Sequence, residues 1–502
     1  MVAKSKTLGK ARPQAAYFEK MSAAELLLFA YTAFECVTSS RLGDFSNHLH
    51  EKIRYRMPSN SSYPEALRFL TKWTNSGLLE QCGDSGLFSL ADGLHQSFWN
   101  WVGGNADLAA NDVELDTFFS ADLLCTLDNM FVLLIMIDKG QARLNKAEEL
   151  TKAARLKLLT SLSLPFKPED KIYQPETYLD WLLSSLESLN LIHVGFSGRL
   201  ELTSGSYHLL TSIQAPQILA QLCTDFMSTQ PIGFFLMLPV LKHRSGWTEW
   251  METAGCLLSD NYEVDNVYDL DECKLNIFEP LRWMGLLDWC PVDHDVSVRS
   301  TPLGRLVFSK LLSGATLQQD SPLKDILSEI YPMDGPDTLL IQPSFELMAT
   351  RGTSWNTRWQ LSQFATLECQ YPDYKYRFNK TSLLEGMKKG LTVDKVLDFL
   401  DKSSPREVPE EVRLTLEMWG RSFGQAVILQ ITLLECATPK LAATIGNARK
   451  YQDYVLGFYS PTALIVRDSE KLRQLLEKQG IFLRPDWLDG EQVAEGQHRF
   501  TN

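Results

Sequence analysis

The first two thirds of the chain repeat one pattern of apolar and polar positions three times, over Tyr63–Leu94, Tyr178–Leu210 and Asn276–Phe308. Each copy begins with apolar residues at helical spacing and reaches a Gly or Asn, which tolerates the left-handed conformation in which helices often end. A short strand, a turn containing Gly or Asp and a second strand follow. The pattern predicts a helix followed by a two-stranded hairpin, the second half of a winged helix.

Helices upstream, such as Ala23–Phe34 and Ala121–Ile137, would supply the first half of these units. The apolar runs Met130–Ile137 and Pro231–Leu241 fall short of the roughly 20 residues that a membrane-spanning helix needs, so they predict buried helices and no membrane contact. The predicted order is a tail (1–20), three winged-helix-like units (21–112, 113–215 and 216–335), a small mixed-sheet domain (336–485) and an acidic tail (486–502).

The signals of the mixed-sheet domain begin after Pro332, Gly335 and Pro336, which break any helix. Helices are predicted over Thr357–Leu367 and Val393–Leu400. Extended segments or strands are predicted over Leu339–Met348, Tyr374–Phe378, Val427–Leu433 and the hairpin Tyr454–Tyr459 with Thr462–Val466. The predicted fold class is therefore α+β and predominantly helical, with an array of winged-helix-like units followed by this domain.

Charge and cysteine usage limit the range of functions. The chain has 502 residues and a net charge of −13, so it has no overall basic field that would draw it to DNA. The nine cysteines stand singly, which argues against a zinc ribbon and against a secreted disulfide framework. We therefore expect reduced cysteines in the cytoplasm, protein partners, and a nucleoid-associated location if DNA is bound.

Contact with nucleic acid would have to come from a local patch. The predicted third helix of the first unit offers Arg68 and Lys72, that of the second unit offers no basic residue, and that of the third unit offers Arg282. These are too few basic side chains to read bases in a major groove. One segment is more basic, although Glu148 and Glu149 interrupt it. It predicts either a solvated helix face or weak phosphate contacts through Lys139, Arg143, Lys146, Lys152, Arg155 and Lys157.

The mixed-sheet domain resembles a known family. The residues that carry the resemblance are Phe378–Ser382, Gly390–Leu400, Pro409, Trp419 and the hairpin ending Leu464–Asp468. They resemble the N-terminal domain of the XPB-type DNA-repair helicase and the related clutch domain in the winged-helix subunit of the transcription and repair factor TFIIH. The resemblance covers less than a third of the chain. The units before it are more similar to the TFIIH subunit.

In that family the domain pairs with the corresponding domain of the helicase. The resemblance implies that this chain docks onto an XPB-type helicase and positions or stimulates it. Residues expected at or near the contact are Tyr374, Tyr376, Arg377, Phe378, Phe458, Tyr459 and Arg467. The aromatic members of this set have a second interpretation as core residues, and a domain that pairs with a structural relative could also form a homodimer.

Catalytic signals are missing from the sequence. The one Gly-Lys pair, Gly9-Lys10, is followed by alanine and not by the Ser or Thr of a phosphate-binding loop. His48 and His50 have no third metal ligand nearby. The sequence therefore predicts no catalytic, metal-binding or cofactor-binding residues and an accessory protein that is not an enzyme. The alternative function is a DNA-binding protein of the winged-helix transcription-factor type.

Overall fold

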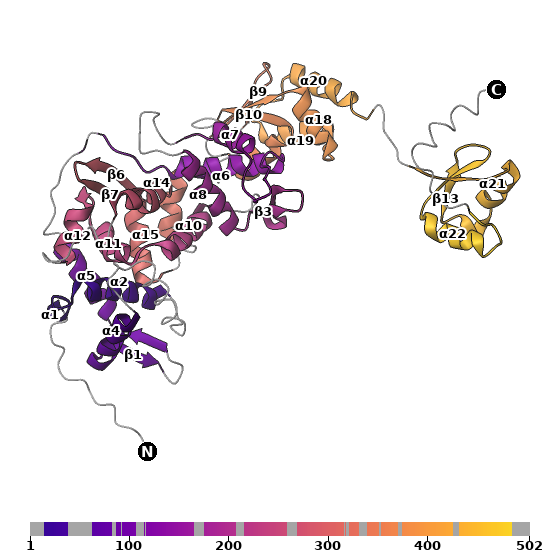
Figure 1. The fold of residues 1–502 in the computed structure, drawn as a ribbon. Coiled ribbons are helices and arrows are strands. Elements are labelled where there is room, and N and C mark those ends of the chain that lie inside the picture. Colours follow the sequence, from indigo (N-terminus) through magenta and orange to yellow (C-terminus); the bar gives the residue numbers. More distant parts are fainter. Residues whose placement is uncertain are drawn as a thin grey trace. The chain divides into compact units, whose positions relative to one another are not determined.

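The computed structural model describes most of the chain. The residues described are 15–38, 63–82, 87–91, 93–106, 115, 117–164, 175–206, 215–258, 269–315, 317, 321–330, 339–350, 353–369, 374–424 and 431–483. The chain forms two compact units, Met1–Gly420 and Arg421–Asn502 (Figure 1). The boundary lies inside the region 336–485 that the sequence predicts to be one domain, whereas the other predicted boundaries stay predictions. His48 and His50 lie outside the described residues.

The first unit begins with three groups of helices, each associated with a small antiparallel sheet. The first group contains α1 (Ala15–Phe18), α2 (Ala23–Thr38), α4 (Tyr63–Ser76), β1 (Leu79–Cys82), β2 (Leu87–Leu90) and α5 (Leu94–Ala106). The second contains α6 (Leu123–Asp138), α7 (Lys152–Ser161), α8 (Pro175–Ser188), β3 (Ile192–Gly195) and β4 (Arg199–Leu202). The third contains α10 (Ala215–Thr229), α11 (Ile232–His243), β5 (Thr248–Glu249), α12 (Trp250–Leu258), α13 (Leu270–Cys273), η4 (Lys274–Phe278), α14 (Glu279–Trp283), β6 (Leu287–Val292), β7 (Asp295–Ser300), α15 (Pro302–Ser313) and α16 (Ser321–Ile330).

The repeated helix-and-hairpin pattern is confirmed in all three groups. The helices before β1, β3 and β6 end at Gly77, Asn190 and Gly285, whose φ angles are 72°, 55° and 76°. Hairpins β1–β2, β3–β4 and β6–β7 follow, all antiparallel. A side chain at Gly285 would also lie 2.7 Å from the Cβ of Leu123, so the close approach of α6 requires glycine there.

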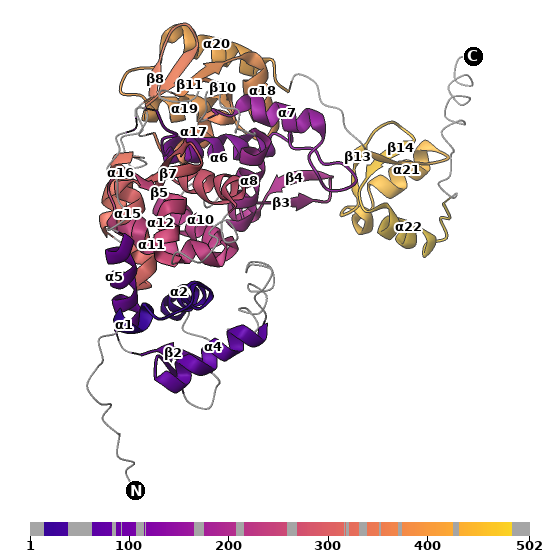
Figure 2. The same ribbon diagram turned by 60° about the vertical axis from the view of Figure 1, so that its left-hand side comes forward.

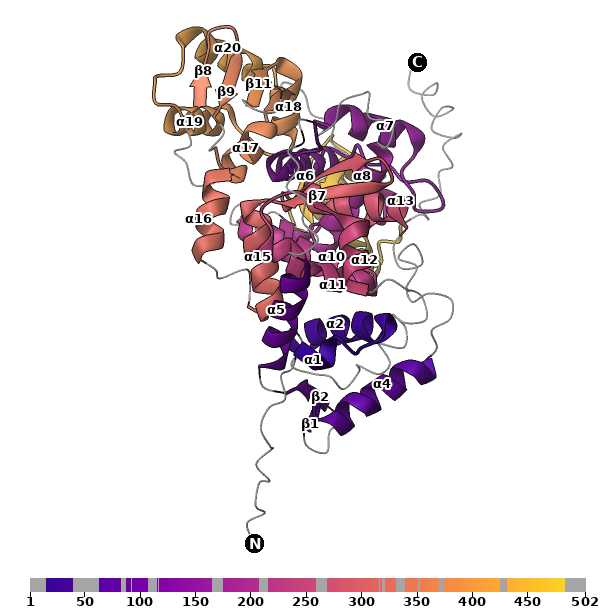
Figure 3. The same ribbon diagram turned by 90° about the vertical axis from the view of Figure 1, so that its left-hand side faces the viewer.

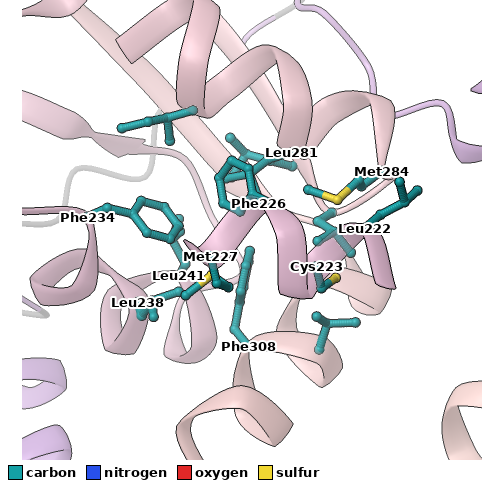
Figure 4. Close-up of a cluster of buried hydrophobic side chains, with 14 of the residues drawn as sticks. Leu222, Cys223, Phe226, Met227, Phe234, Leu238, Leu241, Leu281, Met284 and Phe308 are labelled. Atoms are coloured by element: carbon teal, nitrogen blue, oxygen red, sulfur yellow. The ribbon is translucent and has the colours of Figure 1, made fainter. Parts of the chain in front are cut away.

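The two long apolar runs form buried helices, as the sequence predicts. Every residue from Leu123 to Ile137 of α6 is buried, and so is every residue from Ile232 to Leu241 of α11. Figure 4 shows side chains of α10, α11, α14 and α15 meeting in the core around Phe226, Phe234 and Phe308. Among the described residues, no helix is both long enough and apolar enough to cross a membrane.

The remainder of the first unit is a sheet with helices. Its elements are β8 (Leu339–Ile341), β9 (Glu346–Ala349), α17 (Trp355–Ser362), β10 (Ala365–Cys369), β11 (Tyr374–Phe378), α18 (Lys380–Lys388), α19 (Val393–Ser403) and α20 (Glu410–Arg421). The strand order is β10-β11-β9-β8, and every neighbouring pair is antiparallel. The helix predicted over Thr357–Leu367 is wrong in its second half, because Ala365 to Cys369 pair with β11 as a strand.

The second unit contains β12 (Thr432–Glu435), α21 (Pro439–Gly446), η5 (Arg449–Tyr451), β13 (Val455–Phe458), β14 (Ala463–Val466) and α22 (Ser469–Glu477). Its three strands are antiparallel in the order β12-β14-β13, so the predicted hairpin is confirmed. Residues 427–430 of the predicted strand Val427–Leu433 lie outside the described part of the chain. Both units combine helices with small sheets, and the α+β, predominantly helical fold class is confirmed.

Candidate functional site

Strand β11 does not present the aromatic docking residues that the sequence predicts. It lies inside its sheet, between β10 and β9. Tyr374 and Tyr376 are 0% exposed and Phe378 is 3% exposed, and all three belong to the core between the sheet and its helices. The three buried rings offer no surface to a partner in this structure, and the docking role expected of them stays a prediction. Their second interpretation, as core residues, is confirmed.

Tyr374 instead completes a buried polar cluster that joins two regions far apart in sequence. Its hydroxyl donates to both carboxylate oxygens of Asp128 in α6, at 2.7 Å. Arg358 of α17 donates to the same carboxylate at 2.8 Å, and its guanidinium carbon lies 3.6 Å from the centre of the Tyr374 ring. Burial raises the pKa of Tyr374 above its usual value, so the phenol keeps its proton. Figure 3 shows α17 beside α6, where this cluster forms.

A second ion pair holds the other end of α6 to the same region. The Nζ of Lys389, the C-cap residue of α18, lies 2.7 Å from the Oδ2 of Asp138 at the last position of α6. This pair is more exposed than the cluster around Asp128. The helix α6 therefore contacts the sheet-bearing region at two points, and the two ion pairs position it there.

The other face of β11 is charged. Glu346 of β9 accepts from Lys375 at 2.8 Å and from Arg377 at 2.6 Å, and Arg377 also donates to Glu368 of β10. The hydrogen bond from Lys375 lowers the pKa of Glu346, and the bond to Glu368 raises the pKa of Arg377. Arg377, predicted at the docking contact, is thus half-buried and engaged in a ladder of ion pairs across the sheet.

The second unit leaves apolar side chains uncovered on its sheet. Leu464 and Val466 of β14 face α21 and α22 and are buried with them. Leu433 lies opposite Ile465 in the register, so its side chain belongs to the other face. We call the exposed large side chains on and beside β12 and β13 the apolar sheet surface: Ile431 (41% exposed), Leu433 (42%), Leu456 (61%), Phe458 (50%) and Tyr459 (63%).

Three residues of this region belong to the predicted docking set. Phe458 and Tyr459 lie in the apolar sheet surface and are accessible. Phe458 also packs over Gly446 of α21, where a Cβ would lie 2.4 Å from its ring. Arg467 is exposed and donates to the backbone carbonyl of Asp453. These three residues belong to the second unit, whereas the buried aromatic residues of β11 belong to the first.

The six basic residues predicted to contact phosphate fall into two classes. Arg155 forms an ion pair with Asp180 at 2.7 Å, and Lys139 lies near Glu385, with a pKa lowered mainly by burial. The other four are exposed and form no ion pair with any residue that the structure describes: Arg143, Lys146, Lys152 and Lys157.

The predicted third helices have few free cations to read bases. Lys72 of α4 forms an ion pair with the buried Glu25 at 2.7 Å. Arg282 of α14 is 2% exposed and paired with Glu279 at 2.8 Å. Its guanidinium therefore faces the core and cannot enter a DNA groove. Arg68 of α4 is exposed, and the expectation that these helices do not read bases stays a prediction.

Sequence reasoning missed Phe196, which is fully exposed at the turn between β3 and β4. The only signal for it was a phenylalanine inside the turn Gly195–Gly198, where polar residues are usual. Among the described residues, no group of three or more His, Cys, Asp or Glu side chains lies close enough to hold a metal ion.

Comparison with known proteins relates part of the chain to helicases. Residues 339–457, roughly a quarter of the chain, match the family described as "Helicase conserved C-terminal domain". The match begins at β8 and continues into β13 of the second unit. No curated protein matches the chain.

This match corrects one expectation. The sequence predicts a protein that is not an enzyme, because it lacks a phosphate-binding loop. A helicase conserved C-terminal domain points instead to a helicase-like protein, and such proteins typically hydrolyse ATP. The prediction that the chain is not an enzyme is therefore contradicted. It failed because it was drawn from the absence of short motifs, the phosphate-binding loop among them.

Proposed function

We propose that this chain docks onto an XPB-type DNA helicase and positions or stimulates it on DNA. The match of residues 339–457 to a helicase family supports a helicase-related role. The choice of the XPB type rests on the resemblance carried by Phe378–Ser382 and Gly390–Leu400. The proposed location is the cytoplasm, and the nucleoid when DNA is bound, because the cysteines stand singly and indicate no disulfide framework.

The observation that carries the docking proposal is the apolar sheet surface of the second unit. Its members are 41% to 63% exposed, although the same unit buries a core of its own. Leu433 lies on the face away from α21 and α22, whereas Phe458 lies opposite Leu464 and packs beside α21, so the exposed groups are spread over both faces of the sheet. Exposed apolar groups that are not scattered singly are typical of interaction sites. Among the described strands, β12 and β13 are also the edges of this sheet, and an edge can accept a further strand through main-chain hydrogen bonds.

We further propose that two helix groups of the first unit are winged helices that act as spacers or protein-contact units. In the second group, the segment Ala142–Leu144 pairs with β4 between α6 and α7, and α8 and the hairpin follow. In the third group, β5 lies between α11 and α12, the corresponding position in the element order, and it pairs with β7. A helix, a strand, two helices and a hairpin is the element order of a winged helix.

The alternative, a transcription-factor-like protein that binds duplex DNA, stays a prediction. It needs basic side chains on the third helices, whereas Lys72 and Arg282 are held in ion pairs. It predicts salt-sensitive binding of duplex DNA. An absence of binding to a blunt duplex at low salt would remove it.

The docking proposal is tested by mixing the purified full chain with an XPB-type helicase. Size-exclusion chromatography should show one co-eluting complex, and the unwinding rate of the helicase should rise when the chain is added. Separate elution together with an unchanged unwinding rate would refute the proposal. ATP turnover by the chain alone is measured in parallel, so that its own activity is subtracted from that of the complex.

A further inference from the structure

The hairpin β3–β4 carries its most exposed aromatic residue at its tip. Phe196 is fully exposed, and Val194, two residues before it in β3, is 41% exposed. Figure 2 shows the hairpin extending beyond the helices α6, α7 and α8. A phenylalanine side chain gains about 1.5–3 kcal/mol when it is transferred from water to an apolar environment, so this position favours a contact that covers the ring.

The tip is braced in this conformation. The amide of Gly198 donates to the carbonyl of Gly195 at 3.2 Å and closes the turn, and Gly198 has a φ of 68°. The hydroxyl of Ser197 donates to the carboxylate of Glu201. This carboxylate lies against Gly195, since a Cβ added to Gly195 would be only 2.2 Å from the carboxyl carbon of Glu201. These contacts hold the turn, so Phe196 is held outward instead of folding back onto the hairpin.

A third extended segment places cations beside the hairpin. The amide of Leu144 donates to the carbonyl of Gly198 at 2.9 Å, so Arg143 and the loop after it lie next to the tip. The amide of Thr151 donates to the carbonyl of Arg143 at 2.9 Å, which brings the start of α7 and Lys152 to the same place. Lys146 lies on the loop between them.

These three cations, Arg143, Lys146 and Lys152, are exposed and form no ion pair with the described part of the chain. Three carboxylates lie in the same region: Glu201 accepts from Ser197, Glu149 accepts from the Asn145 amide at 3.3 Å, and Glu148 is exposed on the loop. The surface beside Phe196 thus offers three cations that are not held in ion pairs with described residues, although the whole chain carries −13. An anionic partner with an exposed flat apolar face fits both features.

We propose that the β3–β4 hairpin binds nucleic acid where bases are unpaired. Phe196 stacks on a base, and Arg143, Lys146 and Lys152 contact the adjacent phosphates. Inside a duplex the faces of the bases are covered by their neighbours, whereas strand ends, forks and single strands expose them to aromatic side chains. This function goes beyond helicase docking, and it uses the wing and not the third helix.

The test measures binding of the full chain to a fluorescently labelled forked duplex by anisotropy at low salt. Phe196→Ala should weaken binding about tenfold, since stacking of a base on an aromatic side chain has an energy of that order. Phe196→Trp should restore it. Phe482→Ala is the matched control, because Phe482 is 80% exposed on the second unit, and it should bind as the wild type does.

A salt titration separates the two kinds of contact. Replacing both Lys146 and Lys152 by alanine should reduce the slope of log affinity against log salt by about 0.7 for each phosphate that a lysine no longer neutralises, whereas Phe196→Ala should leave the slope unchanged. The proposal is overturned if Phe196→Ala binds the fork as tightly as the wild type, or if a blunt duplex binds as tightly as the fork. Unchanged DNA affinity with loss of helicase co-elution would assign Phe196 to a protein contact and would overturn it as well.

Discussion

Arg358 and Asp128, 230 residues apart in sequence, form an ion pair of 2.8 Å whose side chains are 0% and 1% exposed. The pair joins α17, within the region matched to helicases, to the buried helix α6. Tyr374 adds a hydrogen bond to the same carboxylate. Because a buried charge without its partner is costly, this cluster should control the stability of the first unit.

Asp128→Ala should destabilise the first unit by about 3–5 kcal/mol, because it leaves the Arg358 guanidinium buried without its counter-charge. The shift of the urea unfolding midpoint measures this loss. The matched control is Asp401→Ala, which removes an exposed pair with Arg413 and should cost less than about 1 kcal/mol. Equal shifts for the two variants would show that the buried pair contributes no more than a surface pair.

Tyr374→Phe should cost about 1.5–3 kcal/mol, because it deletes a hydrogen bond to a charged group but leaves Arg358 paired. The loss should therefore be smaller than that of Asp128→Ala. Tyr459→Phe serves as control, since Tyr459 is exposed and should show almost no change in the unfolding midpoint. A larger loss for Tyr374→Phe than for Asp128→Ala would contradict the assignment of Asp128 as the centre of the cluster.

The cysteines should differ sharply in reactivity. Burial raises the pKa of Cys223 to about 12, whereas Cys256 is exposed. Only the thiolate reacts with iodoacetamide, so at pH 8 Cys256 should be alkylated long before Cys223. Peptide mass spectrometry of the native protein gives both rates. Rapid alkylation of Cys223 would mean that the core shown in Figure 4 opens readily.

Cys223 should also make stability depend on alkaline pH. Its pKa is raised from 9.0 to about 12 on folding, so the folded chain keeps a proton that the unfolded chain releases. The contribution to stability is present below pH 9 and is lost as the pH rises from about 9 to 12. Unfolding midpoints of the wild type should therefore fall more steeply over this range than those of Cys223→Ala. Parallel curves for the two proteins would exclude this linkage.

The sequence could predict the strand β11 but not the role of its side chains. The alternation of Tyr374, Tyr376 and Phe378 with Lys375 and Arg377 correctly indicates that each set shares a face. The strand is internal because β10 and β9 pair with it on either side. The sequence could not indicate this, because the first residues of β10 were predicted as part of a helix. Asp128 lies 246 residues from Tyr374, so no local pattern relates the two.

The candidate binding surfaces, too, could be predicted from the sequence only in part. The hairpin Tyr454–Val466 was predicted, but the exposure of Leu456 and Tyr459 depends on which face α21 and α22 cover, and that is decided by tertiary packing. Phe196 could not be singled out, because one aromatic residue in a turn has no periodic signal. The braced turn around it depends on Glu201 and on the pairing of Leu144, which only the folded chain brings together.

A charged substitution in the apolar sheet surface should weaken docking onto the helicase. Leu456→Lys places a charge on a side chain that is 61% exposed, so the second unit should fold normally while its contact with a helicase is weakened. Leu156→Lys is the matched control, since Leu156 is 65% exposed but lies on α7 of the first unit. Circular dichroism melting curves of both variants should overlay that of the wild type.

The most direct measurement is the dissociation constant of the full chain for an XPB-type helicase, determined by calorimetry for the wild type, Leu456→Lys and Leu156→Lys. The account predicts that Leu456→Lys weakens binding at least about tenfold, the effect of roughly 1.4 kcal/mol, while Leu156→Lys binds as the wild type does. Equal affinities for all three proteins, or no binding by the wild type, would contradict the proposed docking surface.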